Sequence, residues 1–211
     1  MKRKIDMQTA VTPAKFAHFV LRVRDIEKSI DWYQKVLGMT IVHDAGNLAF
    51  MTYDDEHHRL ALAKTPVETE AVRGSPGLDH VAYTLATLGE LLGTYARLKS
   101  LDIEPVWPVN HGLTTSLYYA DPDGNRVEFQ VENFDSIEEL NAFMRSSVFA
   151  ENPIGVEFDP DRLLERYCNG DSLHELRMQG SALRARKKRV NPQTPTFSAS
   201  MPVPRALLPR A

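Results

Sequence analysis

The feature that most constrains this chain is an internal duplication, in which residues 15–65 and 78–133 follow one plan. Each copy starts with a strand pattern, continues with an amphipathic helix and ends with three short strand patterns. Such a repeat decides the architecture before any other feature does. The expected fold class is α+β, with paired βαβββ modules forming one curved mixed sheet.

The first copy carries clear start and stop signals for its helix. A strand is expected at Phe16–Val23, and Asp25 then provides an N-cap for a helix over Ile26–Leu37. Gly38 stands where a C-cap glycine belongs. The three strands after it are expected at Thr40–His43, Leu48–Thr52 and Arg59–Lys64.

The second copy repeats this order after a linker at residues 65–79 that is rich in proline, glycine and charge. A strand is expected at His80–Leu85 and a helix at Thr87–Ser100. The last two strands are joined by a strong turn signal at residues 121–125, because proline fixes φ and glycine permits positive φ. The three strands after the helix are expected at Ile103–Trp107, Thr115–Ala120 and Arg126–Gln130.

The pattern changes after Phe134. Residues 134–180 are predicted to form a C-terminal helical extension, with helices at Ser136–Met144 and from Pro160 to Tyr167 and a short extended piece between them. Residues 1–14 form an N-terminal arm. Residues 181–211 form a proline-rich tail with seven Lys and Arg residues and no acid, which argues against regular structure there.

Composition restricts the class of protein. The formal net charge is −3, and an acidic body with a short basic tail does not predict a nucleic-acid-binding surface. The single cysteine, Cys168, excludes a disulfide framework and a cysteine-ligated structural zinc. There is no apolar run of the roughly 20 residues that a membrane helix needs, and no secretory signal pattern. We expect a cytoplasmic protein without membrane partners.

Three residues stand at repeat-related positions where a metal could bind. His18 and His80 lie on the first strands of the two copies, and Glu128 lies on the last strand of the second copy. Two neutral imidazoles and one carboxylate leave positions open on an octahedral Fe(II), and Mn(II) accepts the same donors. Taken singly, each of these residues has a plain structural explanation, as a satisfied core histidine or a solvent-facing carboxylate. Their joint placement favours a metal site.

Three motifs carry a resemblance to a known family over residues 15–133. They are Ala17-His18-Phe19-Val20, the paired histidines of His57-His58-Arg59-Leu60-Ala61, and Tyr118 ten residues before Glu128 with the Asp121-Pro122-Asp123-Gly124 turn between them. With these motifs the chain resembles the vicinal-oxygen-chelate proteins and, among them, the type I extradiol dioxygenases that open catechols. The extra copy pair of well-known members is missing, which implies a one-domain form.

The resemblance implies substrates and roles. The substrates would be a catechol-type diol and O₂, and the cofactor would be Fe(II). His58 corresponds to the family's acid/base histidine, a role that a neutral imidazole can fill near pH 7. Tyr118 corresponds to the tyrosine that bonds a substrate oxygen, and His111 to a further active-site histidine. The alternative for His58 is a surface residue in an acidic stretch.

Other activities remain open on the same fold. One is a glyoxalase-like isomerase or lyase, which needs a fourth protein ligand on the last strand of the first copy. The predicted strand at Arg59–Lys64 contains no carboxylate. Others are a thiol-transferring resistance protein and a non-catalytic protein that binds aromatic compounds. Phe50, Trp107 and Tyr119 are expected among the walls of the substrate site.

A homo-oligomer is expected as well. Residues 134–168 carry more apolar side chains than two short helices can hide from water. These residues would contribute contacts between copies, unless they are buried on the chain's own body.

Overall fold

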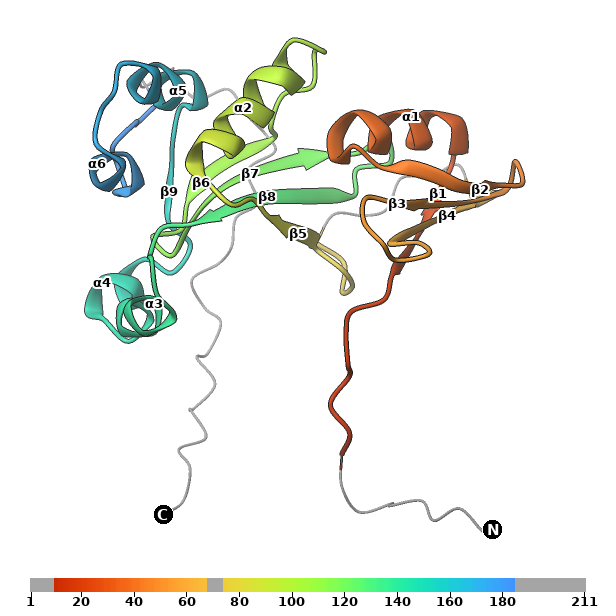
Figure 1. The fold of residues 1–211 in the computed structure, drawn as a ribbon, viewed down its shortest axis with the longest axis horizontal. Coiled ribbons are helices and arrows are strands. Elements are labelled where there is room, and N and C mark those ends of the chain that lie inside the picture. Colours follow the sequence, from red (N-terminus) through yellow and green to blue (C-terminus); the bar gives the residue numbers. More distant parts are fainter. Residues whose placement is uncertain (1–9, 68–73, 185–211) are drawn as a thin grey trace.

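The computed structural model describes residues 10–67 and 74–184, which form two βαβββ modules and a C-terminal extension (Figure 1). The predictions for the first nine residues, for part of the linker and for the tail beyond residue 184 lie outside the described residues. Within the described part, none of the helices has the length and apolar character needed to cross a membrane.

The first module contains a four-stranded mixed sheet covered by one helix. Its strands lie in the order β1-β4-β3-β2, with β1 parallel to β4 and the other pairs antiparallel. The elements are β1 (Phe19–Val23), α1 (Ile26–Leu37), β2 (Thr40–Asp44), β3 (Leu48–Thr52) and β4 (Leu60–Lys64).

The second module repeats this arrangement and gains a fifth strand from the extension. Its sheet has the order β5-β8-β7-β6-β9, with β5 parallel to β8. The elements are β5 (His80–Thr84), α2 (Leu88–Lys99), β6 (Trp107–Asn110), β7 (Thr114–Ala120) and β8 (Arg126–Glu132).

The extension packs against the second module. Its strand β9 pairs with the outer strand β6, and Tyr95 and Lys99 of α2 both bond Asp161 of α5. Ala182 is fully buried and its carbonyl accepts from the Asp159 N–H (2.7 Å), so the packed part continues past residue 180. The elements are α3 (Ile137–Met144), α4 (Ser147–Glu151), β9 (Val156–Glu157), α5 (Pro160–Cys168) and α6 (Leu173–Arg177).

The helix signals of the sequence are confirmed at residue level. The Asp25 carboxylate accepts from the Lys28 N–H, and Gly38 ends α1 in the left-handed conformation. In α2, Thr87 and Glu90 form a capping box, in which each side chain accepts from the other residue's backbone N–H.

The two modules form separate sheets, and the prediction of one curved sheet is wrong in this respect. The edge strands β1 and β5 are not hydrogen-bonded to each other. Side chains join the modules instead: Arg24 bonds Asp123 (Nε–Oδ1, 2.5 Å) and the Tyr33 hydroxyl bonds Asp121 (3.1 Å). The Arg97 guanidinium also donates to backbone carbonyls at the end of α1.

Some predicted strand positions are shifted. The strand expected at Ile103–Trp107 instead begins at Trp107, because Pro105 lacks a backbone donor and residues 103–106 form a loop into the sheet. The strand expected from Arg59 begins at Leu60, so His57 and His58 lie in the preceding loop. The short helices α4 and α6 had no clear sequence signal.

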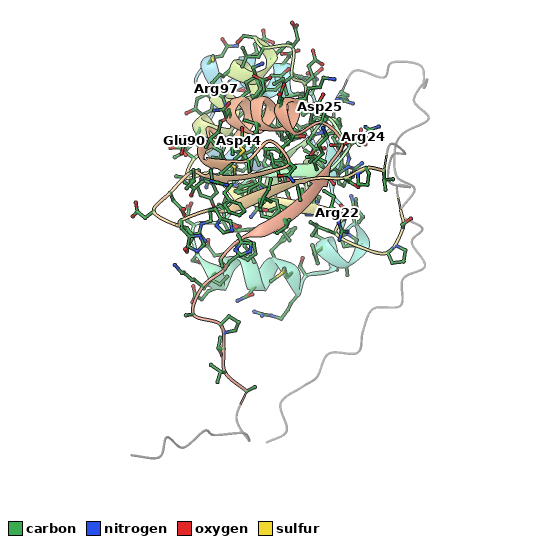
Figure 2. The ribbon with its side chains drawn as sticks, turned by 90° about the vertical axis from the view of Figure 1, so that its right-hand side faces the viewer. Arg22, Arg24, Asp25, Asp44, Glu90 and Arg97 are labelled. Atoms are coloured by element: carbon green, nitrogen blue, oxygen red, sulfur yellow. The ribbon has the colours of Figure 1, made fainter. Side chains whose placement is uncertain are left out.

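Each sheet has one face covered by its own helix, α1 or α2, and α3 and α4 lie on the side of the second module opposite α2 (Figure 1). On β1, Leu21 and Val23 are buried toward α1, whereas Val20 and Arg22 are exposed on the other side. Figure 2 shows α1 above its sheet and Arg22 below it. In Figure 1, α1 and α2 lie on the same side of the molecule. We call the sheet faces opposite α1 and α2 the open faces.

The apolar residues of the extension divide into two groups. Phe158, Leu163 and Leu176 are buried in the core, whereas Ile137 and Val148 are mostly exposed. The chain's own body therefore covers the apolar side chains of the α5–α6 part only. No side chain of α3 or α4 is fully buried. The oligomer expected from this segment remains a prediction.

Gly155, where the extension meets β6, provides a test of this docking. A Cβ there would lie 2.2 Å from the Asn110 carbonyl oxygen, and φ is +103°. We expect Gly155→Ala to lower the free energy of unfolding by more than the roughly 1–2 kcal/mol of left-handed strain alone, measured by urea denaturation. Gly170→Ala is the control, because φ is +85° and no atom lies within 4 Å. Equal losses in both variants would contradict the close approach.

Candidate active site

One cluster of predicted site residues lies on the open face of the second sheet, and we call it the carboxylate half. His80 at the start of β5 and Glu128 on β8 face each other, with 3.1 Å between Nε2 and Oε2. Their side chains are 35% and 5% exposed. The parallel register pairs Ala82 with Glu128, which brings His80 diagonally opposite the carboxylate.

His80 is held by two carboxylates. Its Nδ1 lies 2.8 Å from Asp79 Oδ1, which leaves Nε2 directed at Glu128. The hydrogen bond with Glu128 raises the pKa of His80. Burial alone would raise the pKa of Glu128, but the bonds from His80, Ser116 and Tyr118 hold that pKa below its ordinary value. A carboxylate that orients the second nitrogen of a histidine is typical of metal-ligating imidazoles.

Tyr118 and His111 complete the carboxylate half. The Tyr118 hydroxyl lies 3.1 Å from His111 Nε2, and His111 Nδ1 lies against the Ile154 carbonyl oxygen. A carbonyl only accepts, so Nδ1 carries the proton and Nε2 of the neutral ring is an acceptor. The Tyr118 hydroxyl has one proton, which it can donate either to Nε2 or to the Glu128 carboxylate. Burial lowers the pKa of His111 and raises the pKa of Tyr118. Trp107 packs on the Tyr118 ring at 4.8 Å between centroids.

The other cluster lies on the first sheet, and we call it the histidine half. His18 directly precedes β1, and its ring centroid is 4.3 Å from that of His58. His58 stacks on Phe50 of β3 at 4.6 Å and an interplanar angle of 17°. Partial burial, with the nearby His18 and His57 rings, lowers the pKa of His58. Two imidazoles therefore lie together beside an aromatic face.

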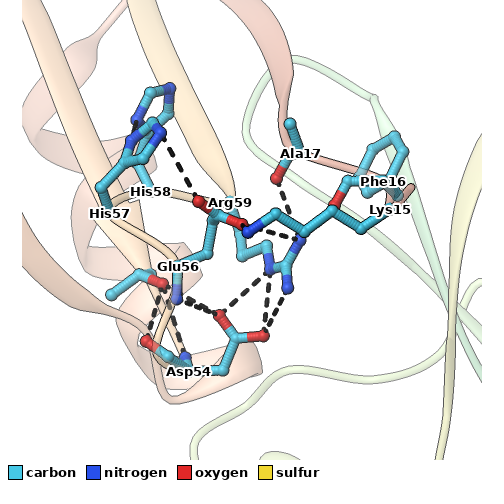
Figure 3. A network of polar contacts seen from close by, with 9 residues as sticks. Lys15, Phe16, Ala17, Asp54, Glu56, His57, His58 and Arg59 are labelled. Carbon is cyan, nitrogen blue, oxygen red and sulfur yellow. Dashed lines mark hydrogen bonds and ion pairs between the residues drawn. The ribbon is translucent and has the colours of Figure 1, made fainter. Parts of the chain in front are cut away.

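A polar network positions the chain segment that carries His18 (Figure 3). The Arg59 guanidinium donates to the carbonyls of Phe16 and Ala17 and to the Asp54 carboxylate. Lys15 forms an ion pair with Glu56, which lies in the same loop as Asp54. The loop before β4 therefore contains His58 and also holds in place the chain segment that leads to His18.

The paired histidines differ from the sequence expectation. In an extended strand, alternation would direct the adjacent residues His57 and His58 to opposite faces. Both lie in a loop instead, and their Nδ1 atoms are 2.6 Å apart. The His57 side chain is 68% exposed and contacts Glu56, whereas His58 packs inward against Phe50. One histidine of the pair therefore faces outward and the other inward, and the conformation of the loop produces this difference.

The carboxylate half and the histidine half do not meet within one chain. His80, Glu128, Tyr118 and His111 are brought together, and so are His18 and His58. In residues 10–67 and 74–184, however, no three His, Cys, Asp or Glu side chains lie close enough to hold a metal ion. The expected convergence of His18, His80 and Glu128 is therefore not seen in the single chain.

The strand registers explain why the two halves differ in chemistry. In the second module, the residue two positions after His80 is Ala82, which pairs with Glu128. In the first module, the residue two positions after His18 is Val20, which pairs with Ala61. Ala61 thus holds the place of the carboxylate in the first module, so the strand provides no fourth ligand there, as the sequence predicted.

Sequence reasoning missed some site residues and misplaced one. Asp79 was not singled out, although its position directly before His80 was a signal. The bonds from Arg59 to the Phe16 and Ala17 carbonyls join segments that the sequence pattern does not connect. Tyr119, expected as a wall of the site, is fully buried on the helix side and packs against Phe129. Phe50 and Trp107 do lie beside the two halves.

Comparison with known proteins places the chain in a family. Residues 15–129 match the model of the Glyoxalase/Bleomycin resistance protein/Dioxygenase superfamily. The match includes most of both modules and all three predicted metal ligands. The chain belongs to this superfamily.

Similar proteins narrow the class further. Biphenyl-2,3-diol 1,2-dioxygenase 2 of Rhodococcus globerulus is 43% identical over 179 residues, covering 84% of this chain and 94% of that protein. Biphenyl-2,3-diol 1,2-dioxygenase 3 of the same organism is 41% identical over 182 residues, covering 85% and 95%. A lactoylglutathione lyase of Neisseria meningitidis is 31% identical over 54% of this chain. The predicted place among one-domain extradiol dioxygenases is confirmed.

The role of Arg59 in positioning His18 can be tested by hydrogen exchange. Arg59→Ala removes the donors to the Phe16 and Ala17 carbonyls. We expect exchange in a peptide covering residues 15–19 to rise about ten-fold, equivalent to the roughly 1.5 kcal/mol of one hydrogen bond to a charged group. Arg162→Ala removes a comparable bond, from Arg162 to the Leu183 carbonyl, and should leave that peptide unchanged. Unchanged exchange in both variants would contradict the role.

Proposed function

We propose that this protein is an Fe(II)-dependent extradiol dioxygenase that opens the ring of a catechol-type aromatic diol with O₂. The similarity to the two biphenyl-2,3-diol 1,2-dioxygenases, which extends over nearly their whole length, carries the proposal. The aromatic side chains beside both halves favour a diol with a second ring, because Trp107 and Phe50 offer flat apolar surfaces.

The metal would be held by His18, His80 and Glu128. The orientation of His80 by Asp79 and the buried Glu128 carboxylate support this assignment, because both are features of metal sites. When bound, Fe(II) supplies a Lewis acid for the two adjacent diol oxygens and the redox chemistry that O₂ requires. Mn(II) accepts the same donors.

Tyr118 and His111 would bind and orient the diol. The Tyr118 hydroxyl can donate to a substrate oxygen once it turns from His111 Nε2, 3.1 Å away. Burial keeps this hydroxyl protonated. Because the Ile154 carbonyl holds the His111 ring, the extension helps to fix the tyrosine.

His58 would accept and return a proton during ring opening. Its ring lies beside His18, so it would stand next to the metal without binding it. Stacking on Phe50 fixes its plane. A positioned imidazole of this kind serves as a general acid and base near neutral pH.

An isomerase of the same fold is less well supported. Such an enzyme needs a fourth protein ligand on the last strand of the first module, where this chain has Ala61. The similarity to lactoylglutathione lyase is lower and covers about half of this chain. A metal-free binding protein would leave the His80–Glu128 pair without a use.

Oxygen uptake tests the proposed activity directly. Protein reconstituted anaerobically with Fe(II) is expected to consume O₂ with catechols and to release a yellow ring-opened product, with both oxygen atoms incorporated. An oxygen electrode and a panel of 3-substituted and bicyclic catechols provide the measurement. Absence of uptake with every diol of the panel would favour the isomerase or the binding protein.

Removal of the His58 imidazole tests the proton transfer. We expect His58→Ala and His58→Gln to retain iron and to bind catechol, because His58 is not a ligand. Turnover should fall about 10²–10⁴-fold, which corresponds to about 2.7–5.4 kcal/mol of barrier. Steady-state kinetics with O₂ uptake, together with elemental analysis, measure both properties.

His57 is the matched control, as an adjacent histidine that is mostly exposed. His57→Ala should lower turnover much less, because its contact with the His58 ring can only help to orient that ring. Equal losses at the two positions would assign the proton transfer elsewhere, with His111 the next candidate.

A further inference from the structure

Three separate parts of the C-terminal extension contact residues 110–112, the segment at the end of β6 that carries His111. At the end of α6, the Arg177 carbonyl accepts from the Asn110 side chain (2.9 Å). On α3, Phe143 packs so closely that a Cβ on residue 112 would lie 2.5 Å from its ring. The loop before β9 makes the third contact. The extension therefore holds a part of the candidate active site, in addition to covering the sheet edge.

The third contact reaches the His111 side chain itself. Its Nδ1 lies against the carbonyl oxygen of Ile154. Strand pairing brings this carbonyl to the ring, because Val156 of β9 pairs with Asn110 and the residues before β9 then run beside His111. The direction of the carbonyl is therefore a property of the main chain, and it depends on the shape of the loop at residues 152–155.

Asn152 determines the shape of this loop. Its side chain bonds Gly155 twice: Oδ1 accepts from the Gly155 N–H (3.0 Å), and Nδ2 donates to the Gly155 carbonyl (2.9 Å). Pro153, whose ring fixes its φ, lies inside the segment that these two bonds close. One bridging side chain and one rigid residue therefore leave the Ile154 carbonyl little freedom to turn away from His111.

The Ile154 carbonyl determines which nitrogen of His111 carries the proton. A carbonyl only accepts, so Nδ1 donates to it and Nε2 of the neutral ring keeps its lone pair. Burial lowers the pKa of His111, which keeps the ring neutral near pH 7. Nε2 lies 3.1 Å from the Tyr118 hydroxyl, within the carboxylate half. The extension thus presents a hydrogen-bond acceptor to the site, where the other tautomer would present a donor.

We propose that Asn152 is a positioning residue of the active site, which holds His111 in the Nδ1–H tautomer through the Ile154 carbonyl. The inference rests on the proposed function, because the diol would be the molecule that Nε2 serves. When the Tyr118 hydroxyl turns to a substrate oxygen, Nε2 is left open to accept from a diol hydroxyl. Asn152 would act through the His111 ring and not by contact with the diol.

NMR of the metal-free protein tests the tautomer without iron or diol. In protein labelled with ¹⁵N-histidine, a ring nitrogen with a proton and one without differ widely in chemical shift, and His111→Gln identifies the His111 signals by their loss. The wild-type ring is expected in the Nδ1–H form alone. Asn152→Ala should show a mixture of the two tautomers, because the loop would no longer hold the carbonyl against Nδ1.

Kinetics of the iron-loaded protein give a second readout. Asn152→Ala should lower kcat/KM for the diol about ten-fold, the effect of one hydrogen bond. Its iron content by elemental analysis should be unchanged, because no proposed ligand is altered. Asn152→Asp keeps the acceptor for the Gly155 N–H and should retain more of the Nδ1–H form than Asn152→Ala. Circular dichroism checks the fold of each variant.

Ser146→Ala is the matched control within the extension. The Ser146 hydroxyl also makes two bonds to the main chain, donating to the Phe143 carbonyl and accepting from the Phe149 N–H at the start of α4. Its removal should weaken the end of that helix. The His111 tautomer and kcat/KM should both stay as in the wild-type protein.

Two results would overturn the positioning role. One is a His111 ring that keeps the same tautomer in Asn152→Ala as in the wild-type protein, because the loop would then not determine it. The other is an equal change in Ser146→Ala, which would assign the effect to a general loosening of the extension. A tautomer that responds to Asn152 alone, in a protein that turns over no diol, would contradict the proposed activity and leave the control of the His111 tautomer standing.

Discussion

The buried carboxylate of Asp121 is the group on which the arrangement of the two modules depends. It accepts from the backbone N–H groups of Asp123 and Asn125, from the Asn125 side chain and from the Tyr33 hydroxyl of the other module. Burial raises its pKa despite these four bonds. A single side chain therefore shapes the turn between β7 and β8 and anchors α1 against it.

This anchor determines where the chemistry lies. Because α1 and the 121–125 turn are joined on the helix side, the opposite faces of both sheets stay free for polar groups. The duplicated modules have diverged on those faces. Where β8 of the second module has Glu128, β4 of the first module has Ala61. The residue paired with each differs as well, since Tyr118 on β7 corresponds to Phe50 on β3. The second module provides a carboxylate and a hydroxyl beside its imidazoles, and the first provides imidazoles and an aromatic ring without a carboxylate.

Local signals in the sequence predicted much of this structure. Asp25 and Gly38 bound α1 as expected, and the 121–125 turn joins β7 to β8. The association of His80 with Glu128 follows from strand pairing that the repeat implied. These features depend on residues that are close in sequence or paired by a regular ladder.

The features that could not be predicted depend on distant side chains. Arg24 and Asp123 are 99 positions apart, and no periodicity in the sequence marks them as partners. Their contact holds the modules as separate sheets, where pairing of β1 with β5 would have produced one. The positions of His57 and His58 depend on a loop that Arg59 ties to the carbonyls of Phe16 and Ala17, which strand alternation does not describe.

The two residues of β9 affect how copies of this chain can associate at their sheet edges. β9 covers β6, the outer strand of the second module, and is itself too short to template another strand. At the far edge of the first sheet, the register of β2 is interrupted between Ile41 and His43, which twists that edge away from regular pairing. Strand-to-strand addition between copies is therefore disfavoured at both of these outer edges.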